Sequence, residues 1–224
     1  MVLTQEKLAR FIDHTLLKSD ATARELDELC SQAVRFGFYG VCVNSARVGH
    51  VSRRLAGESP VPVSVVGFPL GASPSGVKAL ETAMAVEQGA REIDMVLNLG
   101  ALKDGDHALV AEDVAAVVKA AQGASVKVIL ETALLGDAEI VLACKICVDS
   151  GAVFVKTSTG FGPGGATVEA VRLMRVTVGP EVGVKASGGI STYEKALSML
   201  EAGANRIGAS ASVGIVSAKN PEGF

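Results

Sequence analysis

Short apolar runs alternate along this chain with longer segments in which apolar residues recur every three or four positions. A short apolar run bounded by glycine or polar residues is typical of a buried β-strand, and the three-to-four spacing is typical of an amphipathic helix. The pattern predicts eight strands, at residues 11–17, 39–44, 61–68, 92–98, 127–132, 153–156, 183–187 and 206–209.

Helical segments separate these strands. Thr22-Ala23-Arg24-Glu25 has the form of a capping box, in which a hydroxyl and a carboxylate bind the free amides of a helix start, and Gly37 then ends that helix. A last helix is expected to begin near Ser210. Further helices are predicted at residues 45–56, 106–122, 137–149 and 167–178.

Two other helix starts can be read from the sequence. Ser73-Pro74 predicts an N-cap serine followed by proline at the first helical position, and Ser191-Thr192-Tyr193-Glu194 predicts a second capping box. The predicted buried stripe of the helix after Pro74 consists of Val77, Leu80 and Met84.

The strand starts are spaced by about 28 residues, which is the size of one βα unit. Eight such units predict an α/β protein with the (β/α)8 TIM-barrel fold, as a single domain over residues 1–224. The alternative is a doubly wound open sheet, which would need a glycine-rich dinucleotide loop after its first strand. Thr15-Leu16-Leu17-Lys18 is not such a loop, so the barrel is favoured.

Composition narrows the class of protein. Apolar residues make up 49% of the chain, charged residues 20%, the net charge is −3 and tryptophan is absent. This balance argues against a nucleic-acid-binding protein, which needs a basic surface or aromatic stacking platforms. No apolar run has the length of a membrane span, and the first residues lack signal-peptide character, so we expect a cytoplasmic protein without a membrane partner.

Cysteine and histidine are too scattered to suggest a metal site. Cys144 and Cys147 have metal or redox spacing, but they lie in a helical pattern with no second Cys/His pair, and we interpret the cysteines as small buried apolar residues or surface thiols. We therefore expect neither a metal nor another cofactor.

Polar residues at strand ends are the candidates for chemistry, because TIM-barrel active sites lie at the carboxyl ends of the strands. Lys156 and Lys185 each end an apolar strand and precede small residues and glycine, and Asp94 occupies the inward position of another strand. Asp13, Thr15 and Cys42 are predicted to contact a substrate. The remaining strand-end candidates are Asn44, Asn98, Glu131 and Thr132.

Two neighbouring lysines suggest imine chemistry. Two ammonium groups repel, so the less solvated one loses its proton and becomes a nucleophile toward carbonyl carbon. Asp94 can then shuttle protons. The alternatives are that Asp94 only neutralises the lysines, or that Lys156 and Lys185 merely extend to solvent from strand ends.

Glycine-rich loops after the last three predicted strands suggest a phosphate site. Gly160 follows the first of these strands, Gly188 and Gly189 follow the second, and Ser210 follows the third. Barrels often bind phosphate with backbone amides of these loops, where glycine permits close approach. Each loop alone is also compatible with an ordinary turn.

Four segments resemble those of the deoxyribose-phosphate aldolases in order and spacing, over nearly the whole chain. These segments are Asp13-His14-Thr15-Leu16-Leu17-Lys18, Glu92-Ile93-Asp94-Met95-Val96, Val155-Lys156-Thr157-Ser158-Thr159-Gly160-Phe161 and Val184-Lys185-Ala186-Ser187-Gly188-Gly189. The resemblance implies a class I aldolase of deoxyribonucleotide catabolism that interconverts 2-deoxy-D-ribose 5-phosphate with acetaldehyde and D-glyceraldehyde 3-phosphate.

The same resemblance implies roles for individual residues. Lys156 matches the Schiff-base lysine, Asp94 the proton donor and acceptor, and Lys185 the lysine that lowers the pKa of the first. The glycines at 160, 188 and 189 and the serine at 210 match the phosphate site. The chain departs from some members at Phe161, where they have lysine, at Ala211, where they have serine, and at its end, which carries Phe224 and no tyrosine.

Two rival functions fit the barrel. A sugar-phosphate isomerase would need a carboxylate or histidine base but no paired lysines, and a barrel without activity would only bind sugar phosphates. Intact Lys156, Asp94 and Lys185 favour the aldolase. The sequence does not specify the assembly, and a homodimer or a homotetramer is compatible with it.

Overall fold

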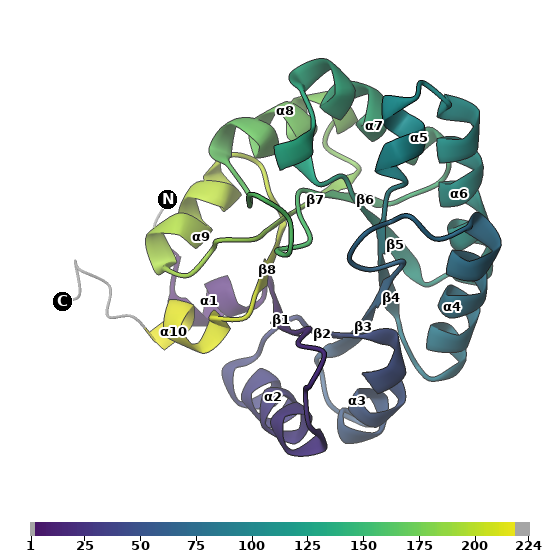
Figure 1. The fold of residues 1–224 in the computed structure, drawn as a ribbon. Coiled ribbons are helices and arrows are strands. Elements are labelled where there is room, and N and C mark those ends of the chain that lie inside the picture. Colours follow the sequence, from purple (N-terminus) through teal and green to yellow (C-terminus); the bar gives the residue numbers. More distant parts are fainter. Residues whose placement is uncertain (1–2, 218–224) are drawn as a thin grey trace.

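The computed structural model describes residues 3–217 and shows a closed barrel of eight parallel strands in sequence order. Figure 1 looks along the barrel, with the helices in a ring outside the strands. The predicted TIM barrel is thereby confirmed. The strands are β1 (Ile12–Leu16), β2 (Gly40–Val43), β3 (Val61–Val66), β4 (Glu92–Val96), β5 (Ser125–Ile129), β6 (Phe154–Lys156), β7 (Gly183–Ser187) and β8 (Arg206–Ala209).

Helices connect successive strands and bury one face against the barrel. The first long one, α2 (Ala23–Phe36), begins at the predicted capping box of Thr22 and Glu25 and ends at Gly37, which has a left-handed φ of 69°. The others are α1 (Gln5–Ala9), α3 (Val48–Arg54), α4 (Ser75–Glu87), α5 (Leu99–Lys103), α6 (His107–Ala120), α7 (Asp137–Asp149), α8 (Val168–Val178), α9 (Tyr193–Glu201) and α10 (Ser212–Ser217), with 3-10 turns η1 (Ser45–Arg47) and η2 (Thr132–Leu134).

The two ends of the described chain close the barrel. β1 pairs with β8 in parallel, with Asp13 opposite Gly208, and Figure 1 shows the purple and yellow strands side by side. Elsewhere in the barrel Asp94 of β4 lies opposite Lys127 of β5, and Lys156 of β6 lies opposite Lys185 of β7. Register therefore brings distant charged residues to similar depths in the barrel.

The largest error in the sequence prediction concerns α4. The expected buried stripe of Val77, Leu80 and Met84 is exposed, at 53%, 62% and 50% of each residue's surface. The opposite face is buried and carries Lys78 and Thr82. Periodicity identifies residues that share a helix face. A lysine can be buried on such a face only when another element supplies its counter-ion, and the spacing within α4 does not reveal that element.

Two predicted helix starts are shifted. Helix α4 begins at Ser75, with Pro74 as an N-cap that has no side-chain hydrogen bond, so Ser73 is not the cap. At α9 the cap is Thr192, whose hydroxyl accepts the Lys195 amide, and Ser191 lies outside the helix. Both differences amount to one residue, which is within the usual variation of helix ends.

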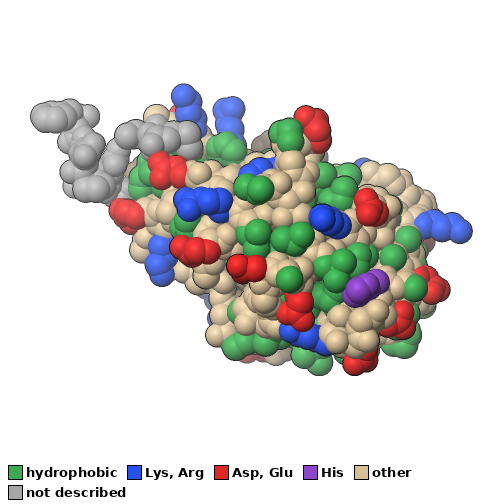
Figure 2. Space-filling model, turned by 90° about the horizontal axis from the view of Figure 1, so that it is seen from above, with side chains coloured by type: hydrophobic (Ala, Val, Ile, Leu, Met, Phe, Trp, Pro, Cys, Tyr) green, Lys and Arg blue, Asp and Glu red, His purple; other side chains and the backbone are tan. Residues whose placement is uncertain are grey.

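The outer surface carries no continuous field of one sign on the side seen in Figure 2, where lysine, arginine, aspartate and glutamate side chains alternate with apolar ones. All four cysteines are buried, as one of the two sequence interpretations required. Within residues 3–217, none of the helices is both long enough and apolar enough to cross a bilayer.

Candidate active site

The inside of this barrel is charged, although branched apolar residues usually fill such barrels. The charged side chains come from two sets of alternate strands. Asp13, Lys127 and Lys185 come from β1, β5 and β7, whereas Asp94 and Lys156 come from β4 and β6. Each of these side chains is at least 95% buried. Buried charges require partners, and here they find them in one another.

Asp94 is the centre of this arrangement. Its Oδ2 accepts hydrogen bonds from Nζ of both Lys156, at 2.8 Å, and Lys185, at 2.7 Å. Its Oδ1 accepts from Lys127 Nζ at 2.7 Å. Three lysines thus share one carboxylate, and the two predicted lysines are brought within a few ångströms of each other by a single oxygen atom.

The surroundings shift the pKa values of the two predicted lysines in opposite directions. Burial lowers the pKa of Lys156, and Lys185 lowers it further, while Asp94 opposes both effects. Burial would also lower the pKa of Lys185, but Asp13 and Asp94 raise it above its ordinary value. The direction agrees with the sequence prediction, but burial is a larger cause than repulsion between the lysines.

Carboxylates near these lysines stay ionised. Burial alone would raise the pKa of Asp94, but Lys127, Lys156 and Lys185 bring it well below its usual range. Burial likewise opposes ionisation of Asp13, and the neighbouring cations, Lys185 first, lower its pKa. At neutral pH both groups are therefore acceptors of hydrogen bonds.

Further ion pairs connect Asp94, Lys127 and Asp13 to two more charged residues. Lys127 also bonds Glu92 at 2.6 Å, and Arg206 bridges Glu92 and Asp13 at 3.0 Å each. Asp13 completes the group by accepting a hydrogen bond from Lys185. The Arg206 guanidinium also lies 3.3 Å from the centre of the Tyr39 ring, a cation–π contact.

The network has a net charge of zero only when Lys156 is neutral. Its cations are then Lys127, Lys185 and Arg206, and its anions are Asp13, Glu92 and Asp94. A proton on Lys156 would add one uncompensated charge in a buried place, which is electrostatically unfavourable. Geometry and charge count therefore agree that Lys156 is the member that holds its proton least firmly.

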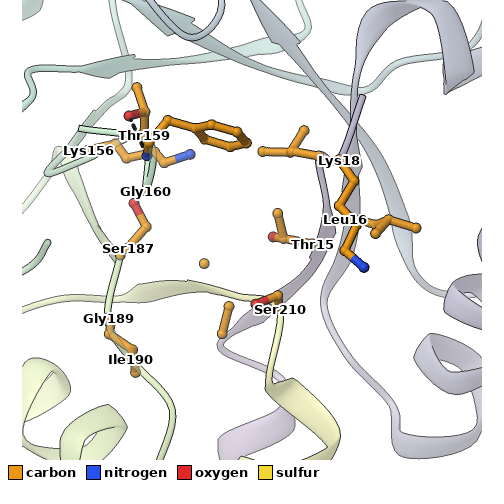
Figure 3. Close-up of a pocket in the computed structure, with 15 residues that line it drawn as sticks. Thr15, Leu16, Lys18, Lys156, Thr159, Gly160, Ser187, Gly189, Ile190 and Ser210 are labelled. Carbon is orange, nitrogen blue, oxygen red and sulfur yellow. Dashed lines mark hydrogen bonds between the residues drawn. The ribbon is translucent and has the colours of Figure 1, made fainter. Parts of the chain in front are cut away.

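Of the lysines in this ion network, Lys156 is the one that lines a cavity. A cavity of about 280 Å³ opens above it at the carboxyl ends of the strands. In Figure 3, Lys156 and Thr159 lie on one wall, Thr15, Leu16 and Lys18 lie on another, and Ser210 and Gly189 lie between them. The cavity is lined by Thr15, Leu16, Leu17, Lys18, Lys156, Thr159, Gly160, Phe161, Ser187, Gly188, Gly189, Ile190, Gly208, Ala209 and Ser210.

The predicted site residues separate into two groups by position. Lys156, Thr15, Gly160, Gly188, Gly189 and Ser210 line the cavity. Below it, Asp94, Lys185 and Asp13 belong to the ion network, and Cys42 is completely buried. Burial raises the pKa of Cys42 to about 11, so its thiol is protonated at neutral pH. The chain end with Phe224 lies outside the described residues.

Comparison with known proteins identifies the family. Residues 7–220 match the model of the DeoC/LacD family aldolases. The chain belongs to the DeoC/LacD aldolase family. It is 56% identical to the deoxyribose-phosphate aldolase of Thermococcus gammatolerans over 96% of this chain and 98% of that protein, and 55% identical to that of Streptococcus pneumoniae over 97% and 99%.

A solved aldolase has the same fold. The deoxyribose phosphate aldolase of Aeropyrum pernix, whose structure is described as tetrameric, superposes with a TM-score of 0.90 at 35% identity. The match covers 96% of this chain and 91% of that one. Similarity over nearly the full length of both proteins indicates that the family match applies to the whole barrel.

Three members of the ion network in this aldolase were missed by sequence reasoning, namely Lys127, Glu92 and Arg206. A signal was present for two of them. Lys127 interrupts an apolar strand, and Glu92 is two positions before Asp94, so it points to the same face of β4. Arg206 begins its strand, where a charged residue is unremarkable, and only the closed barrel brings it to Asp13.

Proposed function

We propose that this protein is a class I aldolase that reversibly cleaves 2-deoxy-D-ribose 5-phosphate into acetaldehyde and D-glyceraldehyde 3-phosphate. The observation that carries the proposal is Lys156 Nζ, which shares one oxygen of Asp94 with Lys185 and borders a cavity. The substrate class is supported by family membership and by relatives of the same name at about 55% identity.

Lys156 supplies the covalent step. Its neutral amine attacks the C1 aldehyde of the open-chain sugar, and loss of water gives a protonated imine. The imine withdraws electrons, so the C2–C3 bond breaks while the C3 hydroxyl loses its proton, and D-glyceraldehyde 3-phosphate leaves. Protonation of the remaining enamine at C2, followed by hydrolysis, releases acetaldehyde and regenerates the amine.

Asp94 and Lys185 support the charge changes of this sequence. The Asp94 carboxylate lies 2.8 Å from the nitrogen that becomes a cation, so it stabilises the protonated imine and can accept a proton from the attacking amine. Lys185 holds the same carboxylate oxygen and remains charged. Its charge favours the neutral form of Lys156 before attack.

The opposite part of the cavity suits the phosphate. Gly160, Gly188 and Gly189 have left-handed φ values of 85°, 86° and 73°. Backbone N–H groups in such turns form concave sites for anions, and a side chain would strain these conformations. Ser210 adds a hydroxyl, and Lys18 is the cation among the lining residues that the imine chemistry does not use.

Reduction with borohydride tests the proposal directly. Incubation with deoxyribose 5-phosphate and borohydride should convert the imine into a stable secondary amine, and peptide mapping should locate the adduct on Lys156. Incubation with acetaldehyde alone should modify the same residue. The matched control omits the aldehyde and should give unmodified protein.

Two results would contradict the proposal. An adduct on Lys18, which lines the same cavity, would assign the nucleophile to another residue. Turnover of the sugar phosphate with no trapped adduct at any lysine would indicate an isomerase-like mechanism without an imine, which was one of the rival functions.

A further inference from the structure

Glu131 has an unusual conformation next to the active site. It follows β5 with φ 52° and ψ 59°, the left-handed region that a residue with a side chain rarely adopts. The residue is almost completely buried, with only 3% of its surface exposed. Strained backbone of this kind persists where the surrounding structure holds it, and it is frequent at functional sites.

The carboxylate of Glu131 binds the loop that follows Lys156. Its Oε2 accepts hydrogen bonds from both the backbone amide of Thr159, at 3.2 Å, and the Thr159 hydroxyl. That hydroxyl in turn accepts the amide of Phe161 at 3.1 Å. One carboxylate oxygen thus fixes the conformation on both sides of Gly160.

Two further features concern the surroundings of the Glu131 carboxylate. A Cβ atom added to Gly162 would lie 2.9–3.1 Å from the carboxylate atoms, so only glycine permits the loop to approach so closely. The second carboxylate oxygen, Oε1, is buried without a hydrogen-bond partner among the described residues. A group that only stabilised the fold would gain more from satisfying both oxygens.

The other side of the same loop is bound to β7. The Thr157 hydroxyl donates to the Ser187 carbonyl at 3.1 Å, and the Ser187 hydroxyl donates to the Ser158 carbonyl at 2.6 Å. The chain is therefore held by β7 up to Ser158 and by Glu131 at Thr159. The next residues, Gly160 and Phe161, line the cavity, whereas Glu131 itself does not.

We propose that Glu131 is a positioning residue, which holds the Thr159–Phe161 segment in the shape that receives the phosphate of the substrate. The proposal rests on the proposed aldolase function and gives a specific role to Glu131, which the sequence indicated only as a strand-end candidate. Glu131 acts through Thr159, and within residues 3–217 it forms no hydrogen bond to Lys156 or Asp94. It should therefore affect phosphate recognition and leave imine formation unchanged.

The variant Glu131→Gln tests this role with little change in shape. The amide oxygen still accepts from Thr159, but the bonds lose the assistance of the negative charge and the buried NH2 group has no acceptor. We expect KM for deoxyribose 5-phosphate to rise about tenfold, with kcat changed less than about threefold. KM for unphosphorylated deoxyribose and the acidic limb of the pH profile should stay in place.

Glu139→Gln is the control. Glu139 Oε2 accepts the backbone amide of Gly136 at 2.7 Å at the start of α7, and Glu139 is not among the residues that line the cavity. This variant should leave both KM values within about twofold. Thr159→Val removes the hydroxyl that donates to Glu131. The double variant Glu131→Gln/Thr159→Val should therefore raise KM no more than the single variant with the larger effect.

Equal losses on phosphorylated and unphosphorylated substrates, or a shifted acidic limb, would overturn the proposal, as would lower thermal stability with an unchanged KM. If Glu131→Gln does not fold, Thr159→Val provides the test. The proposal then requires that Thr159→Val raise KM for the phosphorylated substrate alone. Failure of the aldolase function itself would look different, because the unmodified protein would give neither turnover nor a borohydride adduct.

Discussion

Lys78 and Lys156 are both buried and bonded to an aspartate, yet of these two only Lys156 lines the active-site cavity. Lys78, on α4, donates to Asp113 of α6 and to the Val96 carbonyl at 2.9 Å, and both members of the pair are completely buried outside the barrel. Lys156, inside the barrel, shares a single oxygen of Asp94 with Lys185. Burial beside a carboxylate is therefore common to both.

The difference lies in the number of cations for each carboxylate. Asp113 has one lysine, so the proton on Lys78 is matched by one negative charge. Asp94 has three lysines, and the surrounding network is already neutral without a proton on Lys156. A reactive lysine is thus recognised by an excess of neighbouring cations and an opening to solvent.

The largest expected effect is on activity. Lys156→Ala removes the nucleophile, so cleavage of deoxyribose 5-phosphate should fall by at least about three orders of magnitude and the borohydride adduct should disappear. Circular dichroism should show an intact fold. Substantial activity in this variant would refute the assignment of the nucleophile.

The next effect is on stability. Lys78→Met leaves Asp113 as a buried carboxylate without its cation, which is expected to lower the free energy of unfolding by about 3–5 kcal/mol. Denaturant titration measures this loss. The acidic limb of the rate profile should not move, because within residues 3–217 the hydrogen bonds of Lys78 go to Asp113 and the Val96 carbonyl. A shifted limb would mean that the two lysine pairs are coupled.

A smaller effect is expected from Lys185→Leu. Removing this charge removes repulsion and lets Asp94 act more strongly on Lys156, so the pKa of Lys156 should rise and its neutral fraction at pH 7 should fall. The acidic limb of kcat/KM should move to higher pH by about 1–2 units, which corresponds to roughly 1.4–2.8 kcal/mol. Activity lost equally at every pH would instead assign Lys185 to substrate binding.

The smallest effect should come from replacing both members of the outer pair. Lys78→Met combined with Asp113→Leu exchanges an ion pair for apolar contact, which is often nearly neutral for stability. The free energy of unfolding should return to within about 1 kcal/mol of that of the original protein, and kcat and KM should be unchanged. If the double variant is as unstable as Lys78→Met alone, the Val96 carbonyl contact is the more important partner of Lys78.

This comparison also shows how far sequence reasoning reaches. The positions of Lys156, Lys185 and Asp94 could be predicted, because strand periodicity and barrel topology together determine which residues meet at strand ends. The buried face of α4 could not, because Lys78 is buried only through Asp113, which is 35 residues away on another helix. Apolar Leu80 and Met84 then remain on the outside.

The active site, too, could be predicted only in part from local sequence patterns. Glu131 was recognised as a strand-end residue, but its importance depends on a left-handed backbone and on a contact with Thr159, 28 residues later. Neither can be read from local pattern. Lys127 and Glu92 carried a periodic signal, but their pairing depends on the register between β4 and β5.

Closure of the barrel by β1 and β8 has a consequence for synthesis of the chain. Asp13 meets Lys185 and Arg206 across sequence separations of 172 and 193 residues. A nascent chain that has been made only as far as β6 already contains Lys156 but lacks both cations, as well as the walls that exclude water from it. Its lysine is then an ordinary ammonium group. The lowered pKa of the nucleophile therefore depends on the last strands to be synthesised, because Lys185 lies on β7 and Arg206 on β8.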